Sequence, residues 1–298
     1  MVVLPRERTL IVEEISAVLL SASNRAVLGG QPGVGKSTVL DALVEHVLEQ
    51  PGTMVLRSRS LREGPYVPFH GLRDLFADLD VADFTLPEAQ RDALLGALGR
   101  SHPSETPPHL LYLAIDSVLR ELSTRFTVII AIDDLDVIDH DTHEVIKFVT
   151  HRPSNTGRRE SYIGTITSDP LLFGSESTFD LAACAVEELY ALPPLSRGAF
   201  TSVLASSSRF TVGESDVDEL FRRTGGNPLW AFELYYQTTA GAPLRNVPKS
   251  LSMVTRTKIE SRHRWEGDRC PEGLLRLSVG LEAQDVLWAD LEQALARA

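Results

Sequence analysis

One short motif constrains this chain more than any other feature: G-x-x-x-x-G-K-[ST], running from Gly30 to Ser37. A short apolar run at 26–28 precedes it, and apolar residues at helical spacing follow it over 39–47. A backbone that curls around a phosphate must approach it closely and adopt positive φ, which glycine does at little cost. The alternative is a glycine-rich turn before an ordinary helix, but the strand–loop–helix setting favours phosphate binding.

The loop and the start of the next helix are the expected nucleotide-binding residues, because their exposed N–H groups form an anion site. Lys36 is expected to place its charge at the β- and γ-phosphates, and Ser37 to offer its hydroxyl to Mg²⁺. The full predicted set in this segment is Gly30, Gln31, Pro32, Gly33, Val34, Gly35, Lys36, Ser37 and Thr38.

A second motif is a run of mostly β-branched residues, 127–132, that ends in Asp133 and Asp134. Such a run is typical of a strand buried on both faces of a parallel sheet, and ligands bind at the carboxyl ends of these strands. Asp133 is the expected Mg²⁺ partner together with Ser37, directly or through water. Asp134 is the candidate to polarise the attacking water, so that Lys36, Asp133 and Asp134 form the predicted catalytic set. The alternative is a strand that ends in a solvated acidic turn, because three further acids follow: Asp136, Asp139 and Asp141.

Composition limits the classes of protein that remain. The length of 298 residues suits one sizeable α/β domain plus a smaller one. A hydrophobic content of 43% and a mean hydropathy of −0.04 suit a globular protein, without a run approaching the ~18 apolar residues of a membrane span. No hydrophobic signal core is evident, and two cysteines are too few for a disulfide framework or zinc site, so we expect a cytoplasmic protein. The net charge of −12 argues against gripping a polyanion as the main task.

The remaining pattern predicts an α/β fold: a P-loop NTPase core (1–185) with a central, mostly parallel sheet flanked by helices. A small helical lid (186–245) and a short α/β tail (246–298) are expected to follow. Further strands are predicted at 54–56 and 162–168, and an extended segment at 189–195. Helices are predicted at 10–20, 70–79, 85–100, 110–122 and 142–151, and in the lid at 196–206, 214–224 and 230–238. Thr167 or Ser168 is a candidate γ-phosphate sensor, with an ordinary strand-end turn as the alternative. Candidates for arginines that act on a neighbouring subunit are Arg152, Arg158 and Arg159; the alternative for each is an ordinary solvated side chain.

Residues 1 to about 245 resemble the ATPase module of STAND-type AAA+ proteins, specifically the Orc1-like ATPase domain of large LuxR-family bacterial regulators. The matching pieces, besides the loop and the acidic pair with Leu135, are Pro5-Arg6-Glu7-Arg8, Glu63 with 65–69, Leu192–Ser196 and Gly225–Leu229. The resemblance implies that Pro228 and its neighbours contact the nucleotide from the lid, and that ATP or ADP sets the arrangement of lid and core. Two departures bear on hydrolysis more than on binding: Leu135–Asp139 reads LDVID where the family has LHWAD, and Ser168-Asp169 stands where an arginine is common.

The tail has a different resemblance. Residues 259–298 are similar to the C-terminal end of PLP-dependent transsulfuration enzymes, of which cystathionine γ-synthase and γ-lyase are the nearest type. The resemblance implies that Arg276 would match the arginine that holds the substrate carboxylate. The lysine and phosphate site of that fold have no counterpart here, so PLP chemistry is not expected. The sequence is interpreted as an ATPase module joined near residue 250 to a remnant of another gene.

Together these patterns favour a nucleotide-operated switch that binds ATP/ADP with Mg²⁺ and hydrolyses ATP slowly. Its expected partners are the nucleotide and a protein partner or a second copy through the ATPase domain, without direct nucleic-acid or membrane contact. The alternatives are a steadily hydrolysing AAA+-like ATPase or phosphotransferase, a non-catalytic module that merely retains a nucleotide, and a PLP enzyme.

Overall fold

The computed structural model describes residues 4–21, 24–60, 66–101, 107–151, 159–167, 185–206 and 214–239. The chain divides into two units, Met1–Asn246 and Val247–Ala298, and every described residue belongs to the first. The predictions made for Glu63, Arg152, Arg158, Ser168, Arg276 and the tail therefore lie outside the described residues.

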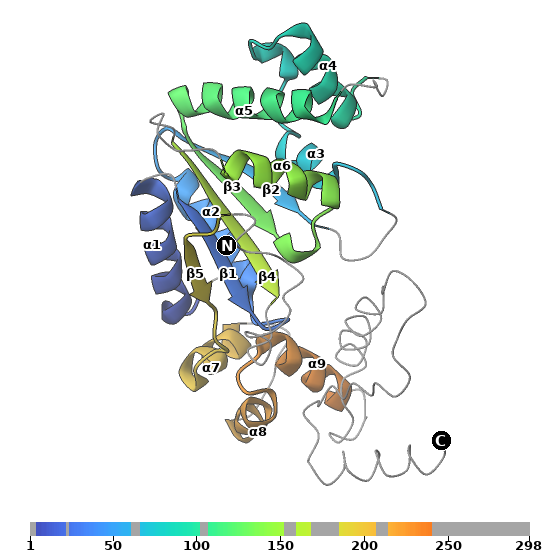
Figure 1. The fold of residues 1–298 in the computed structure, drawn as a ribbon. Helices are drawn as coiled ribbons and strands as arrows, with labels where there is room; N and C mark the ends of the chain where they lie inside the picture. The colour runs from blue at the N-terminus through green and yellow to red at the C-terminus, as the bar shows by residue number, and fades with distance from the viewer. Residues whose placement is uncertain are drawn as a thin grey trace, which may run out of the picture. The chain divides into compact units, whose positions relative to one another are not determined.

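The core of the first unit is a five-stranded parallel sheet in the order β2-β3-β4-β1-β5 (Figure 1). Strands β1, β3 and β4 are buried along nearly their whole length, as a parallel sheet covered on both faces requires. The α/β fold and its parallel sheet, predicted from the sequence, are confirmed. The strands are β1 (Arg25–Gly30), β2 (Thr53–Arg59), β3 (Thr127–Asp133), β4 (Glu160–Thr167) and β5 (Glu188–Ala191).

Helices cover both faces, because each parallel crossover must return the chain over the sheet. Helices α1 (Arg6–Ser21) and α2 (Lys36–Leu48) pack on one face around Ile15, Leu19 and Leu40. On the other face lie α3 (His70–Leu75), α5 (Pro108–Arg125) and α6 (His140–Thr150), with α4 (Glu88–Ala97) packed against α5. Alternate residues of β3 enter the two cores, Ile129 the first and Ile130 the second.

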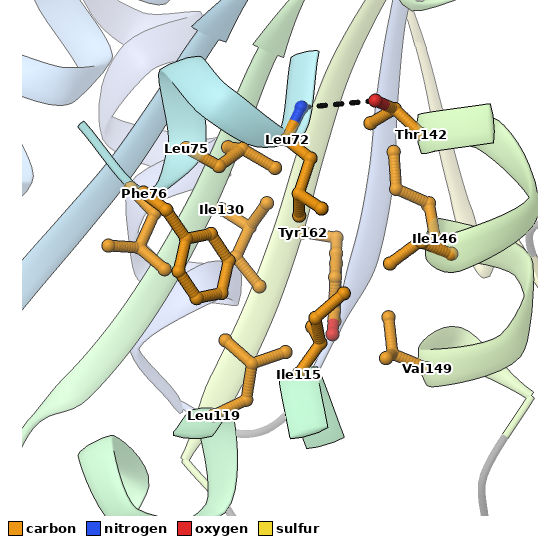
Figure 2. A pocket seen from close by; sticks show the side chains of 12 residues that line it. Leu72, Leu75, Phe76, Ile115, Leu119, Ile130, Thr142, Ile146, Val149 and Tyr162 are labelled. Atoms are coloured by element: carbon orange, nitrogen blue, oxygen red, sulfur yellow. Dashed lines mark hydrogen bonds between the residues drawn. The ribbon is translucent and has the colours of Figure 1, made fainter. Parts of the chain in front are cut away.

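The second core encloses a small apolar cavity between the sheet and α3, α5 and α6 (Figure 2). Ten of its twelve lining residues are apolar, and at its rim the backbone N–H of Leu72 donates to the Thr142 hydroxyl at 3.0 Å. The cavity is a packing gap on the face opposite α2, the helix that begins at Lys36.

Within the described residues, three helices follow the sheet and form a separate small core: α7 (Arg197–Ser206), α8 (Glu214–Thr224) and α9 (Pro228–Thr239). Phe200 lies at its centre, with its ring edge-on to Phe221 at a centroid distance of 5.3 Å. Gly225 and Gly226 adopt positive φ after α8, and a Cβ at Gly226 would lie 2.2 Å from the Leu195 carbonyl oxygen. The helices predicted for the lid are therefore present, and a glycine turn separates the last two.

The predicted boundaries differ most around α3 to α5. The helix predicted to reach residue 79 ends at Leu75, where Arg100 donates to the carbonyl oxygens of Phe76 and Leu79 and holds the chain in turns. The helix predicted from residue 110 begins at Pro108, since proline is well suited to a first helical turn. None of the helices in the described part of the chain has the length and hydrophobicity of a membrane span.

Candidate nucleotide-binding site

The predicted phosphate-binding loop connects β1 to α2 and has the backbone geometry that such a loop needs. Gly33 and Gly35 have φ values of 76° and 101°, in the left-handed region that favours glycine. Val34 between them is buried, and its N–H donates to the Gln31 carbonyl at 3.3 Å. Gly35 is the residue immediately before α2, so the N-terminus of that helix opens directly onto the loop.

Lys36 begins α2 and folds back over the loop. Its Nζ donates to the carbonyl oxygens of Gly30 at 2.9 Å and Gln31 at 3.0 Å, and the residue is only 6% exposed. A lysine at this point is a positive charge kept out of bulk water at the mouth of the loop, where it is worth more to an anion than an exposed lysine would be. The loop backbone thus surrounds the ammonium group of Lys36.

The two sequence motifs meet at Asp133, the last residue of β3. Its Oδ1 accepts hydrogen bonds from the Ser37 hydroxyl at 3.1 Å and from the Thr165 hydroxyl at 2.7 Å. Ser37 lies 96 positions away in the chain, and Asp133 is fully buried. The fold therefore brings together the hydroxyl and the carboxylate that the sequence analysis assigned to Mg²⁺.

The other carboxylate oxygen of Asp133 accepts from Arg59, with 3.3 Å between Nε and Oδ2. Arg59 ends β2, and the pairing of β2 with β3 places it directly opposite Asp133. Sequence reasoning missed both Arg59 and Thr165. The one signal for them was that each lies in or just after a predicted strand whose carboxyl end lies at the same end of the sheet as Asp133. The sequence did not reveal which strands are neighbours of β3.

Asp134 follows in a left-handed conformation, with φ 56° and ψ 49°. Its N–H donates to the Thr165 hydroxyl at 2.8 Å, so the same hydroxyl donates to the first acid and accepts from the second. This turn leads into a short 3-10 helix, Leu135–Val137. Thr167, one of the two predicted sensor residues, lies at the end of β4 opposite Gly30, beside the start of the loop. Arg159 lies exposed just before β4.

The lid contacts the loop through the start of α9. Asn227 is fully buried, and its Nδ2 donates to the Pro32 carbonyl oxygen at 2.9 Å. The Leu229 N–H donates to the Gly33 carbonyl at 3.3 Å, and a Cβ on Gly33 would lie 2.5 Å from the Leu229 Cβ. Pro228, the predicted lid contact, lies between these two residues as the first residue of α9.

The N-terminal helix also holds the segment that joins sheet and lid. The Glu7 carboxylate accepts from the Ser196 N–H at 3.1 Å, and the Arg8 guanidinium donates to the Pro193 carbonyl oxygen. Arg8 is 3% exposed, and burial lowers the pKa of its guanidinium from the ordinary value. The Pro5–Arg8 and Leu192–Ser196 motifs are therefore in direct contact.

A parallel sheet with this loop after its first strand and two acids at the end of a second buried strand, β3, defines the class of P-loop NTPases. The chain belongs to the AAA ATPase domain family, whose model matches residues 6–160, a little over half of the chain. The donor set fits the ligands of that class: Ser37 and Asp133 supply the hard oxygen atoms that Mg²⁺ prefers.

Three solved archaeal structures share the fold. The Aeropyrum pernix ORC1 protein in complex with DNA is 17% identical, with a TM-score of 0.52 over 87% of this chain and 67% of that chain. The A. pernix ORC2 protein in ADPNP–ADP complexes is 12% identical, with a TM-score of 0.50 over 89% and 70%. Cdc6p from Pyrobaculum aerophilum is 16% identical, with a TM-score of 0.50 over 80% and 63%. At these identities the likeness concerns the fold alone.

A curated relative matches a much shorter stretch. A protein of Streptomyces coelicolor described as a cystathionine gamma-lyase is 58% identical over 40 residues. This stretch is 13% of this chain and 10% of that protein, so the chain spans about a tenth of the relative's length. The resemblance of the tail to transsulfuration enzymes stays a prediction.

Proposed function

We propose that this chain binds ATP or ADP together with Mg²⁺ and acts as a slowly hydrolysing nucleotide switch, the ATPase module of a STAND-type, LuxR-family regulator. The observation that carries the proposal is the hydrogen bond between the Ser37 hydroxyl and the Asp133 carboxylate, at the mouth of a loop that also holds Lys36. These three groups are those that a Mg·nucleotide needs at one point in space.

In this proposal the backbone N–H groups of residues 33–38 hold the phosphates, and Lys36 contributes its charge to the β- and γ-phosphates. Ser37 and Asp133 would hold the metal, which when bound neutralises charge on the phosphate oxygens. Asp134 would orient the attacking water, and Thr165 would position both acids through its single hydroxyl.

The lid supplies the switching element. A bound phosphate would contact the same loop whose Pro32 and Gly33 carbonyls accept hydrogen bonds from Asn227 and Leu229. A shift of these carbonyls would therefore move the N-terminus of α9, beside Pro228, through the two hydrogen bonds. ATP and ADP would favour different lid positions only if they bind the alternative arrangements with different affinity.

Slow hydrolysis is proposed on two departures from the family pattern, the LDVID sequence at Leu135–Asp139 and Ser168-Asp169 in place of an arginine. The second candidate is a steadily hydrolysing AAA+-like ATPase, favoured by the position of Asp134 directly after Asp133 and its tie to Thr165. A partner protein or a second copy, acting through the ATPase domain in the cytoplasm, remains part of the proposal. DNA contact and PLP chemistry do not.

The proposal is tested by denaturing the purified protein to identify any released nucleotide, and by titrating it with a fluorescent ATP analogue in Mg²⁺. We expect Lys36→Ala to weaken binding about 30-fold or more, since it removes a charged contact in a water-poor site. The matched control is Lys147→Ala, which removes a lysine paired with Glu144 on helix α6. Absence of binding by the unsubstituted protein, or equal binding by the Lys36 variant, would overturn the proposal.

A further inference from the structure

Arg59 has a fixed backbone beside the candidate metal site. It ends β2 in register with Asp133, and the N–H of the next residue, Ser60, donates to the Asp133 carbonyl at 3.0 Å. The Arg59 N–H itself lies 3.3 Å from the Asp74 carboxylate, a contact from helix α3. The start of the Arg59 side chain is therefore held in place at the acid.

The two partners of the Arg59–Asp133 ion pair differ greatly in solvent exposure. The Asp133 side chain is 1% exposed, whereas the Arg59 side chain is 65% exposed. A buried carboxylate is costly unless a cation or several donors compensate its charge, so Asp133 needs a partner. An arginine that is mostly in solvent can exchange this partner for water at little cost, so Arg59 can leave.

Mg²⁺ would use the same carboxylate. The two hydroxyls on Oδ1 can remain beside a metal, because hydroxyl groups carry no net charge, but a guanidinium on Oδ2 adds a positive charge next to a dication. Like charges this close together repel each other. The metal and Arg59 therefore oppose each other at Asp133.

We propose that the Arg59 guanidinium and Mg²⁺ compete for the Asp133 carboxylate, so that Arg59 sets how much Mg²⁺ the protein needs to bind its nucleotide. This rests on the proposed function. Arg59 is then a positioning residue that compensates Asp133 before the metal arrives and is displaced when the Mg·nucleotide binds. Arg59 lies on β2, an edge strand of the sheet, so metal binding would change the position of a side chain at the surface of the domain.

The test compares Arg59→Gln with Arg57→Gln in binding a fluorescent ATP analogue over a range of Mg²⁺ concentrations. Arg57 is two residues away on the same strand and pairs with Asp41, with both side chains partly exposed. Competition predicts that Arg59→Gln lowers the half-saturating Mg²⁺ concentration by about threefold or more, while Arg57→Gln leaves it unchanged. Arg59→Lys, which keeps the charge, should stay near the unsubstituted protein.

A second readout is thermal unfolding, first without metal or nucleotide and then with both. In EDTA alone, Arg59→Gln should lower the melting temperature by roughly 2–4 °C, because Asp133 loses its cation. In a separate sample with Mg·ATP and no EDTA, most of that difference should disappear. An unchanged or raised half-saturating Mg²⁺ concentration in Arg59→Gln overturns the competition while the proposed function stands. Failure of the unsubstituted protein to bind nucleotide overturns both.

Discussion

The side-chain amide of Asn227 donates to the Pro32 carbonyl at 2.9 Å, and so ties the first turn of the last lid helix to the phosphate-binding loop. The same side chain accepts from the Trp230 N–H at 3.3 Å and caps α9. One buried residue thus serves both the loop and the lid.

Asn227→Ala should therefore loosen the lid. The variant loses a helix cap and leaves the Pro32 carbonyl without this donor, which together should cost about 1–2 kcal/mol of unfolding free energy. Faster hydrogen exchange of the α9 amides would report the loss. Ser196→Ala is the control, because Ser196 caps α7 through the Ala199 N–H and its side chain does not reach the loop. Equal hydrogen-exchange rates of the α9 amides in both variants would contradict a role of Asn227 in holding the lid on the loop.

Thr165→Val should disturb both acids at once. The replacement has nearly the same shape but removes the hydroxyl that donates to Asp133 and accepts from the Asp134 N–H. A buried carboxylate and a partly buried N–H each lose a partner, for a predicted cost of roughly 1–3 kcal/mol in urea unfolding. Thr165→Ser should restore most of this loss. Thr150→Val, which removes a buried hydroxyl bonded only to helix carbonyls, should cost less.

Asp134→Asn separates hydrolysis from binding. If Asp134 orients the attacking water, the variant should hydrolyse ATP about 100-fold more slowly, while the nucleotide dissociation constant changes little. Phosphate release measures the first quantity and equilibrium titration measures the second. The control is Asp92→Asn, at an exposed position of α4. Unchanged turnover would favour the non-catalytic module, and rapid turnover that depends on Lys36 in the unsubstituted protein would favour the steady ATPase.

Tyr66 should show a high-pH signature. Its hydroxyl donates to the Asp141 carboxylate, and this hydrogen bond raises the pKa of Tyr66 from 10.0 to about 12. Because the folded-state pKa lies above the ordinary value, the contribution of the bond to stability is complete below pH 10 and is lost as the pH rises through about 12. Absorbance titration of the protein minus that of Tyr66→Phe should show one late tyrosine, which Asp141→Asn should return towards pH 10.

Much of this fold could be predicted from local sequence. The run at 127–132 and the glycine loop each specify their own conformation, since β-branched residues favour a buried strand and glycines permit positive φ. The lid helices could also be predicted from local sequence. Their apolar residues recur at helical spacing, and glycines separate α8 from α9.

The contacts that complete the site could not be predicted, because they depend on which strands are neighbours. Ser37 and Asp133 were paired by the two motifs, but Arg59 and Thr165 reach Asp133 only because β2 and β4 flank β3. Similarly, the expectation that Pro228 and its neighbours contact the nucleotide stays a prediction, and the hydrogen bonds from Asn227 and Leu229 to the loop itself had no signal in the sequence. Long-range packing supplied these contacts.

The left-handed backbone at Asp134 has a practical consequence for anyone who engineers this domain. Besides Asp134, the described residues other than glycine with positive φ are Phe69 and Ala185. A thermostability design that replaces such residues with glycine would select all three positions, since glycine adopts this conformation without conflict from a Cβ atom. At Phe69 the exchange would remove a ring that packs against the second core, whereas at Asp134 it would remove the carboxylate on which turnover is proposed to depend. A variant selected for stability would then have lost its hydrolytic activity.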